Sequence, residues 1–201
     1  MKKVTFRLLR HAKDEKSLEA TLPAEELKRA GAVGARETRD YTKVGYSPLA
    51  RAIQTALAAV LENFGVPEML EAEPAFGTLA MLAEMVAPSQ FQAIASVKGN
   101  YQALYDVHDR AKVYAWRDAM VAAFDKLFVR CVNSDFVLLS IHSPSVEMTI
   151  DGLMQRQDEP TPPECLTMAE LDSVLVEATQ EADGAPINVK IIEKTPAPAV
   201  E

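Results

Sequence analysis

Residues 4–11 read VTFRLLRH and residues 136–142 read FVLLSIH. Each stretch is a mainly apolar run of strand length that stops at a histidine. The second run is apolar almost without interruption, which is typical of a strand buried on both faces of a parallel sheet. The two stretches therefore predict two strands, each followed at its carboxyl end by a polar turn.

The rest of the chain alternates between helix and strand patterns. Residues 78–131 lack strand signals and predict two or three helices, the longest over about 106–130. Further helices are expected over 23–38, from Ser47-Pro48 to about residue 64, and over 144–154, and further strands over 43–46, 69–72, 173–179 and 187–193. The last two strands are separated by EADGAP and predict a closing hairpin. This order predicts an α/β fold, with three α/β/α layers around a mostly parallel sheet.

The length of 201 residues suits one domain with a sizeable core. Apolar residues make up 48% and charged residues 25%, which is typical of a globular protein. The chain contains no repeat and no linker. We therefore expect a single domain over 1–195, with 196–201 as a loose tail.

The charge distribution argues against general binding of nucleic acids. The net charge is −8, and residues 157–201 account for it with ten acids against two bases. The remainder is neutral, so the chain has no extended basic face of the kind that nucleic acids require. No apolar run reaches the length of a membrane span, and the N-terminus lacks the pattern of a signal peptide. With two cysteines, Cys131 and Cys165, we expect a cytoplasmic protein with reduced thiols, although a disulfide stays possible.

Polar side chains gather where three predicted strands end. Arg10 and His11 follow the first strand, Arg51 lies just after the second, and His142 follows the strand over 136–141. In open α/β sheets, ligands bind outside the carboxyl ends of the strands. Each residue alone is more often a packing or solvated residue than a functional one, but their combination predicts one shared site.

This combination resembles the histidine phosphatase superfamily, which includes the phosphoglycerate mutases and the phosphohistidine phosphatases. The resemblance is carried by an Arg-His motif after strand one, a Leu-x-x-x-Gly helix pattern, a Ser-Pro-x-x-Arg-Ala-x-x-Thr-Ala turn and a second histidine. These motifs are matched here by Arg10 and His11, by Leu27 and Gly31, by Ser47, Pro48, Arg51, Ala52, Thr55 and Ala56, and by His142. The match covers residues 4–56 and 135–155, and it implies a phosphoglycerate mutase-like fold.

The resemblance implies a cofactor-free phosphatase with His11 as the nucleophile. The chemistry agrees, because a phosphoryl group needs one nucleophile and several cationic or N–H donors. Arg10 and Arg51 would hold the phosphate oxygens, and His142 would donate to the same oxygens. Ser17 would be a further, weaker contact with phosphate. The sequence contains no metal-ligand spacing and no P-loop.

The proton donor for the leaving group is expected to be Glu84, an acid among apolar residues, which would raise its pKa. A partly exposed helix glutamate is an equally good interpretation. Glu71 and Glu73 fit less well, because they lie within or beside a predicted strand.

The chain also departs from the family pattern. Ala12 stands where glycine is usual, Ser143 follows the second histidine, and Arg7 lies inside strand one. The His-x-Pro sequence at 142–144 resembles the short phosphohistidine phosphatases more than the mutases.

The expected activity is hydrolysis of a phosphomonoester or a phosphohistidine. The expected partner is a small phosphorylated metabolite or a phosphohistidine protein, and the oligomeric state stays open. Two alternatives stay open as well: a mutase-type phosphotransferase, and a non-catalytic relative that binds phosphate or a partner protein.

Overall fold

The computed structural model describes residues 1–13, 21–63 and 65–199. Its centre is a six-stranded sheet with the order β3-β2-β4-β1-β5-β6. The strands are β1 (Lys2–Arg10), β2 (Lys43–Tyr46), β3 (Glu68–Met69), β4 (Phe136–Ile141), β5 (Ser173–Gln180) and β6 (Asn188–Thr195). The first four pair in parallel, and β5 and β6 form an antiparallel hairpin beside β1. The predicted sheet and its closing hairpin are confirmed.

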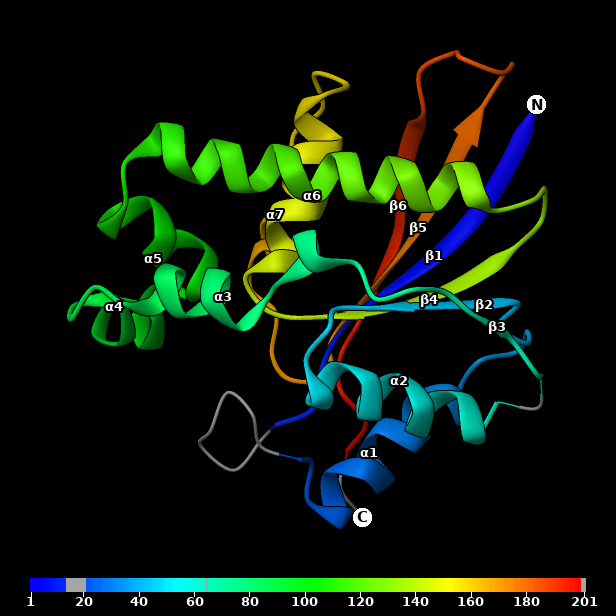
Figure 1. The fold of residues 1–201 in the computed structure, drawn as a ribbon, viewed down its shortest axis with the longest axis horizontal. Helices are drawn as coiled ribbons and strands as arrows, with labels where there is room; N and C mark the ends of the chain where they lie inside the picture. The colour runs from blue at the N-terminus through cyan, green and yellow to red at the C-terminus, as the bar shows by residue number, and fades with distance from the viewer. Residues whose placement is uncertain (14–20, 64, 200–201) are drawn as a thin grey trace.

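Helices cover both faces of this sheet (Figure 1). One face carries α1 (Ala24–Ala35) and α2 (Ala50–Leu61), and the other carries α6 (Arg110–Arg130) and α7 (Ser145–Gln155). The predicted three-layer α/β/α architecture is therefore confirmed. None of the helices in the described ranges combines the length and hydrophobicity needed to cross a bilayer.

The segment between β3 and α6 is more divided than the sequence predicted. It begins with the 3₁₀ turn η1 (Pro74–Phe76) and continues through α3 (Leu79–Val86), α4 (Phe91–Lys98) and α5 (Asn100–Val107). Residues 78–131 thus form four helices rather than two or three. Pro88 separates α3 from α4, and Gly99, with φ +84°, separates α4 from α5.

The strand at 136–141 is buried on both faces, as its apolar sequence predicts. Its six residues are all buried, and successive side chains point to opposite sides. Val137, Leu139 and Ile141 join the larger core cluster with α6 and α7, whereas Phe136 and Leu138 join the smaller cluster with α1 and α2. The middle of the sheet is therefore held by apolar packing in both layers.

The C-terminal residues that the structure describes are held against the domain, unlike the loose tail expected from the sequence. The Ala197 backbone N–H donates to the Asp172 carboxylate at 3.0 Å, and the Pro196 carbonyl accepts from Arg36 at 3.2 Å. Ala197 also packs against the smaller core cluster. The proline-rich composition of the tail did not indicate these partners. Cys131 and Cys165 are buried free thiols.

Helices α1 and α2 approach each other most closely at Gly34. A Cβ atom on this residue would lie 1.7 Å from the Ala59 carbonyl oxygen of α2. A Cβ on Gly31, one turn earlier, would meet the Glu62 side chain at 2.9 Å. The first neighbour is backbone and cannot move without shifting a helix, whereas the second is a flexible side chain.

We therefore expect Gly34→Ala to destabilise the protein by about 1–3 kcal/mol or more, because the two helices must separate. Gly31→Ala is the matched control on the same helix. It gains helix propensity and should change the free energy of unfolding by no more than about 1 kcal/mol. Urea denaturation of both variants tests this, and equal effects would contradict the proposed helix contact.

Candidate active site

Three turns meet at the carboxyl edge of the sheet. β4 pairs in parallel with both β1 and β2, which aligns Arg10 with Ile141 and Tyr46 with Ser140. Backbone hydrogen bonds continue past the strand ends, from His11 N to the Ile141 carbonyl at 2.9 Å and from Ser47 N to the Ser140 carbonyl at 3.1 Å. The residues that follow the three strands are thus fixed beside one another.

The two histidines that the sequence singled out face each other at this edge. Their ring centroids lie 4.7 Å apart, with an angle of 62° between the planes. His11 is 8% exposed and His142 is 1% exposed. The structure therefore brings together two imidazoles that are 131 positions apart in the sequence and shields both from water.

The hydrogen bonds of His11 define its tautomer. Its Nδ1 lies 2.5 Å from the carbonyl oxygen of Ala12, and because a carbonyl only accepts, Nδ1 carries the proton. Burial lowers the pKa of His11 to about 3, and the charges of Arg51 and Arg10 act in the same direction. His11 is therefore neutral near pH 7, with a free electron pair on Nε2.

The turn after His11 is tied to α2. The Ala12 backbone N–H donates to Thr55 Oγ1 at 3.0 Å, and the Thr55 hydroxyl donates to the Arg51 carbonyl at 2.7 Å. The Ala12 methyl group is fully buried in the smaller core cluster. The alanine found where the family has glycine is thus accommodated by packing.

His142 is held from two sides by residues of the second turn. Its Nε2 lies 2.5 Å from Ser47 Oγ, and its Nδ1 accepts from Arg51 Nε at 3.4 Å. Since Nδ1 accepts, Nε2 carries the proton and donates to the serine. Burial sets the pKa of His142 well below its usual range, and the charges of His11, Arg51 and Arg10 lower it further.

Ser47 is the residue whose role the sequence interpretation missed. The sequence predicted that a helix begins at Ser47-Pro48, but α2 begins at Ala50 with Leu49 as its cap residue. The serine hydroxyl binds His142 instead. Gly77 was also missed: its φ is +127°, and a Cβ there would lie 2.9 Å from the His142 ring. A single glycine in an irregular segment offers no sequence signal for such a contact.

Arg10 and Arg51 both act electrostatically on the two histidines. The Arg10 guanidinium donates through Nη1 to the Met168 carbonyl and through Nη2 to Glu170 at 2.9 Å. Its Nε is buried and makes no hydrogen bond within the described part of the chain. Arg51 lies in the first turn of α2 and is 5% exposed. The four residues predicted from the strand ends are therefore brought together.

Glu84 lies elsewhere. It is on α3, its side chain is 51% exposed, and it forms an ion pair of 2.5 Å with Lys112 of α6. Within the described ranges, no hydrogen bond or ion pair joins it to either histidine. The buried residues of α3 are Leu82 and Met85, so the apolar neighbours of Glu84 in the sequence point inward while Glu84 points to solvent. The expected proton donor is thus a solvated glutamate, which corrects the sequence-based interpretation.

Glu73 lies on the segment that leads from β2 to Gly77. Its backbone N–H donates at 3.0 Å to the carbonyl of Tyr46, the last residue of β2, and Ser47 follows directly. Its carboxylate caps η1, accepting from Ala75 N at 3.1 Å, and this turn leads to Gly77 against His142. The predicted phosphate contact Ser17 falls outside the described residues.

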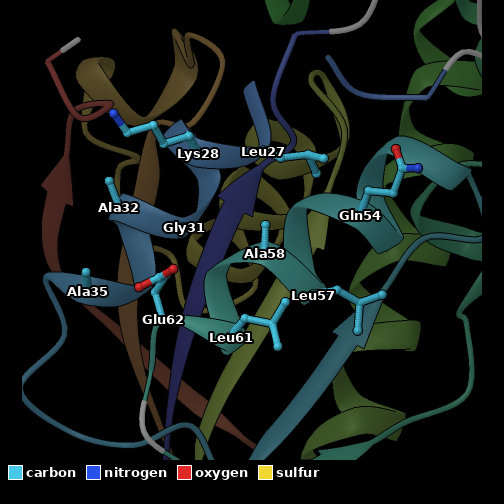
Figure 2. A pocket seen from close by; sticks show the side chains of 10 residues that line it. All are labelled: Leu27, Lys28, Gly31, Ala32, Ala35, Gln54, Leu57, Ala58, Leu61 and Glu62. Carbon is cyan, nitrogen blue, oxygen red and sulfur yellow. The ribbon is translucent and has the colours of Figure 1, made fainter. Parts of the chain in front are cut away.

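One further feature, a groove, lies away from this edge. A groove of about 700 Å³ between α1 and α2 is lined mainly by apolar residues, among them Ala32 and Ala58, and also by Lys28 and Glu62 (Figure 2). None of its lining residues belongs to the histidine site. Among the described residues, no group of three or more His, Cys, Asp or Glu side chains could hold a metal ion.

Comparisons with known proteins give matches among solved structures alone. No protein-family model matches the chain, and no curated protein matches it. The solved structures include YhfR of Bacillus stearothermophilus, with 14% identity, 94% of this chain and 96% of that chain covered, and a TM-score of 0.61. They include a mycobacterial glucosyl-3-phosphoglycerate phosphatase, with 13% identity, coverage of 94% and 97%, and a TM-score of 0.61. A phosphoserine phosphatase of Entamoeba histolytica has 17% identity, coverage of 95% and 96%, and a TM-score of 0.58.

These similarities extend over nearly the whole chain at low identity. They cover the segment over 73–130, where the sequence resemblance fades, as well as the strand-end motifs. A phosphoglycerate mutase from Bacillus anthracis is among the matching structures, with a TM-score of 0.59. The chain therefore has the phosphoglycerate mutase-like fold, as its strand-end motifs predicted.

Proposed function

We propose that this protein is a phosphatase that hydrolyses a phosphomonoester or a phosphohistidine through a phosphohistidine intermediate on His11. The observation that carries this proposal is the state of His11, a buried neutral imidazole with a free electron pair on Nε2. It faces His142, and the charges of Arg51 and Arg10 act on it, which supports a site with one nucleophile and three donors.

In the first step, Nε2 of His11 attacks phosphorus and the bond to the leaving oxygen or nitrogen breaks. The leaving group departs with the electron pair of that bond and takes up a proton. The imidazole ring gains a positive charge. The hydrogen bond from its Nδ1–H to the Ala12 carbonyl oxygen stabilises this charge. In the second step, water attacks phosphorus and the N–P bond breaks. Neutral His11 is regenerated, and inorganic phosphate is released.

The donors of the site fit the charge of a phosphoryl group. Arg10 Nε is a buried donor that makes no hydrogen bond within the described ranges, and we assign it to a phosphate oxygen. In the free protein, burial first and the charges of His11, Arg51 and Arg10 next hold the pKa of His142 well below its usual range, so the ring is neutral. A bound dianion would reverse that field and raise the pKa of His142. His142 would then bind a proton and donate it toward the transferring oxygens.

We assign the proton donor for the leaving group to Glu73. A basic alkoxide must be protonated as it departs, whereas an aryl oxide or an imidazole leaves more readily. Glu73 lies on the segment between Tyr46 and Gly77, which borders the second histidine. Glu84 has no such place, since it is paired with Lys112 in solvent.

The structural neighbours and the leaving-group chemistry support two candidate substrate classes. The structural neighbours named above are a glucosyl-3-phosphoglycerate phosphatase and a phosphoserine phosphatase, which favours a small phosphorylated metabolite. A cytoplasmic phosphohistidine protein is the second candidate, because its leaving group needs little protonation. A screen of phosphorylated metabolites together with a phosphohistidine peptide would distinguish the two.

His11→Ala should lower kcat for para-nitrophenyl phosphate by more than about 10³-fold, because the nucleophile is removed. The matched control is His108→Ala, which removes the third histidine, hydrogen-bonded to the Met85 carbonyl outside the site. Circular dichroism should show that both variants are folded. Near-normal turnover by His11→Ala would overturn the mechanism, and a wild-type protein without turnover would favour a phosphate-binding relative.

Glu73→Gln should slow hydrolysis of an alkyl phosphate by roughly 10²–10⁴-fold, with little effect on an aryl phosphate. The reason is that a proton donor matters in proportion to the basicity of the departing group. Glu84→Gln serves as the control and should leave both rates unchanged. Steady-state kinetics with the two substrates decide the assignment: equal losses for both in Glu73→Gln would count against a donor role.

A further inference from the structure

Glu147 is a buried acid that the proposed reaction does not use. It lies on α7, five residues after His142, and is 1% exposed. Its Oε1 accepts two hydrogen bonds, from Ser143 Oγ at 2.6 Å and from the Met168 backbone N–H at 3.4 Å. Its Oε2 is buried without a hydrogen-bond partner in the described part of the chain.

This arrangement fits a neutral carboxylic acid. Oε1 takes the place of the carbonyl oxygen, which accepts two donors, and Oε2 takes the place of the hydroxyl. An ionised carboxylate would instead leave a buried negative oxygen without a donor, which is costly. The geometry thus favours the protonated form.

The two partners of Glu147 belong to the two sides of the candidate site. Ser143 lies in the turn that carries His142, and its hydroxyl also accepts from Asn100 at 3.0 Å. Met168 lies in the segment after η2 (Pro163–Leu166), and its carbonyl accepts from the Arg10 guanidinium. Hydrogen bonds, joined through the backbone of Met168, therefore link the second histidine turn through Glu147 to Arg10.

We propose that Glu147 is a positioning residue for the phosphate site, setting the place of Arg10 relative to His142 through Met168 and Ser143. This inference rests on the proposed function, since it assumes that the two groups bind one phosphoryl group. Glu147 itself touches no reacting atom. It acts as a rigid link because the Ser143 hydroxyl and the Met168 N–H both bind its Oε1, and the side chain is buried.

The charge of Glu147 also affects how Arg10 binds an anion. Burial raises its pKa to about 7, while Ser143, Arg10 and the Met168 N–H act in the opposite direction. The folded pKa lies above the unfolded value, so the stability from the neutral acid is complete below pH about 4.5 and is lost as the pH rises through 7. Above pH 7, the ionised Glu147 carboxylate would offset the positive charge of Arg10. The guanidinium group of Arg10 already pairs with Glu170. Anion binding should then weaken.

The test compares Glu147→Gln, which keeps a neutral acceptor, with Glu147→Leu, which removes the link. Asp151→Asn is the matched control, a buried acid one turn further along α7 that binds Thr161 and Gln155 instead. The probe is tungstate, a dianion from pH 6 to 8.5, measured by calorimetry. Hydrolysis of para-nitrophenyl phosphate is followed in parallel.

Glu147→Leu should weaken tungstate binding and lower kcat/KM, the latter by up to about 10²-fold, as expected for a displaced phosphate-binding group. Glu147→Gln and Asp151→Asn should stay within a few-fold of wild type at pH 6. Between pH 6 and 8.5, the wild-type Kd should rise by roughly three- to tenfold relative to that of Glu147→Gln. Both proteins keep His11 and His142, so the comparison between them reports on Glu147.

Wild-type affinity and kcat/KM in Glu147→Leu would overturn this role. If that variant does not fold, identical pH dependence of Kd in wild type and Glu147→Gln would overturn it. Failure of the proposed function gives a different result, because the wild type would then bind tungstate without turnover or would not bind it.

Discussion

The parallel pairing of β4 with both β1 and β2 is the constraint on which the rest of the structure depends. It places the ends of three strands at one edge and aligns Arg10 with Ile141 and Tyr46 with Ser140. A slip of one residue would turn each side chain to the opposite face and move the two histidines apart. The register is held by β4, whose alternate residues are packed into separate core clusters on the two sides of the sheet.

The electrostatics of the edge follow from this placement. Both histidines are buried at this edge, and burial together with the charges of Arg10 and Arg51 holds them neutral. Arg10 Nε is a buried donor without a hydrogen-bond partner in the described ranges. A phosphoryl dianion would neutralise the arginines and allow His142 to take up a proton, which is the state needed to stabilise transferring oxygens. Binding and chemistry thus depend on the same charges.

Much of the fold could be predicted from the sequence, because its signals are local. The apolar run at 136–141 indicated a strand buried on both faces, and the strand-end residues Arg10, His11, Arg51 and His142 indicated one site. The places of Ser47 and Gly77 could not be predicted in this way, because their contacts with His142 depend on how distant segments cross. The prediction for Glu84 was wrong for the same reason, because apolar neighbours in the sequence do not show on which side of a helix an acid lies.

The central claim is that His11 is a nucleophile rather than only a phosphate ligand. Rapid acid-free quenching with a ³²P-labelled aryl phosphate tests it most directly, followed by peptide mapping of the labelled protein. The account predicts a phosphoryl label that is stable to alkali, labile to acid and located on the peptide that contains His11. Steady turnover with no label on this peptide, or with a label on another residue, would contradict it.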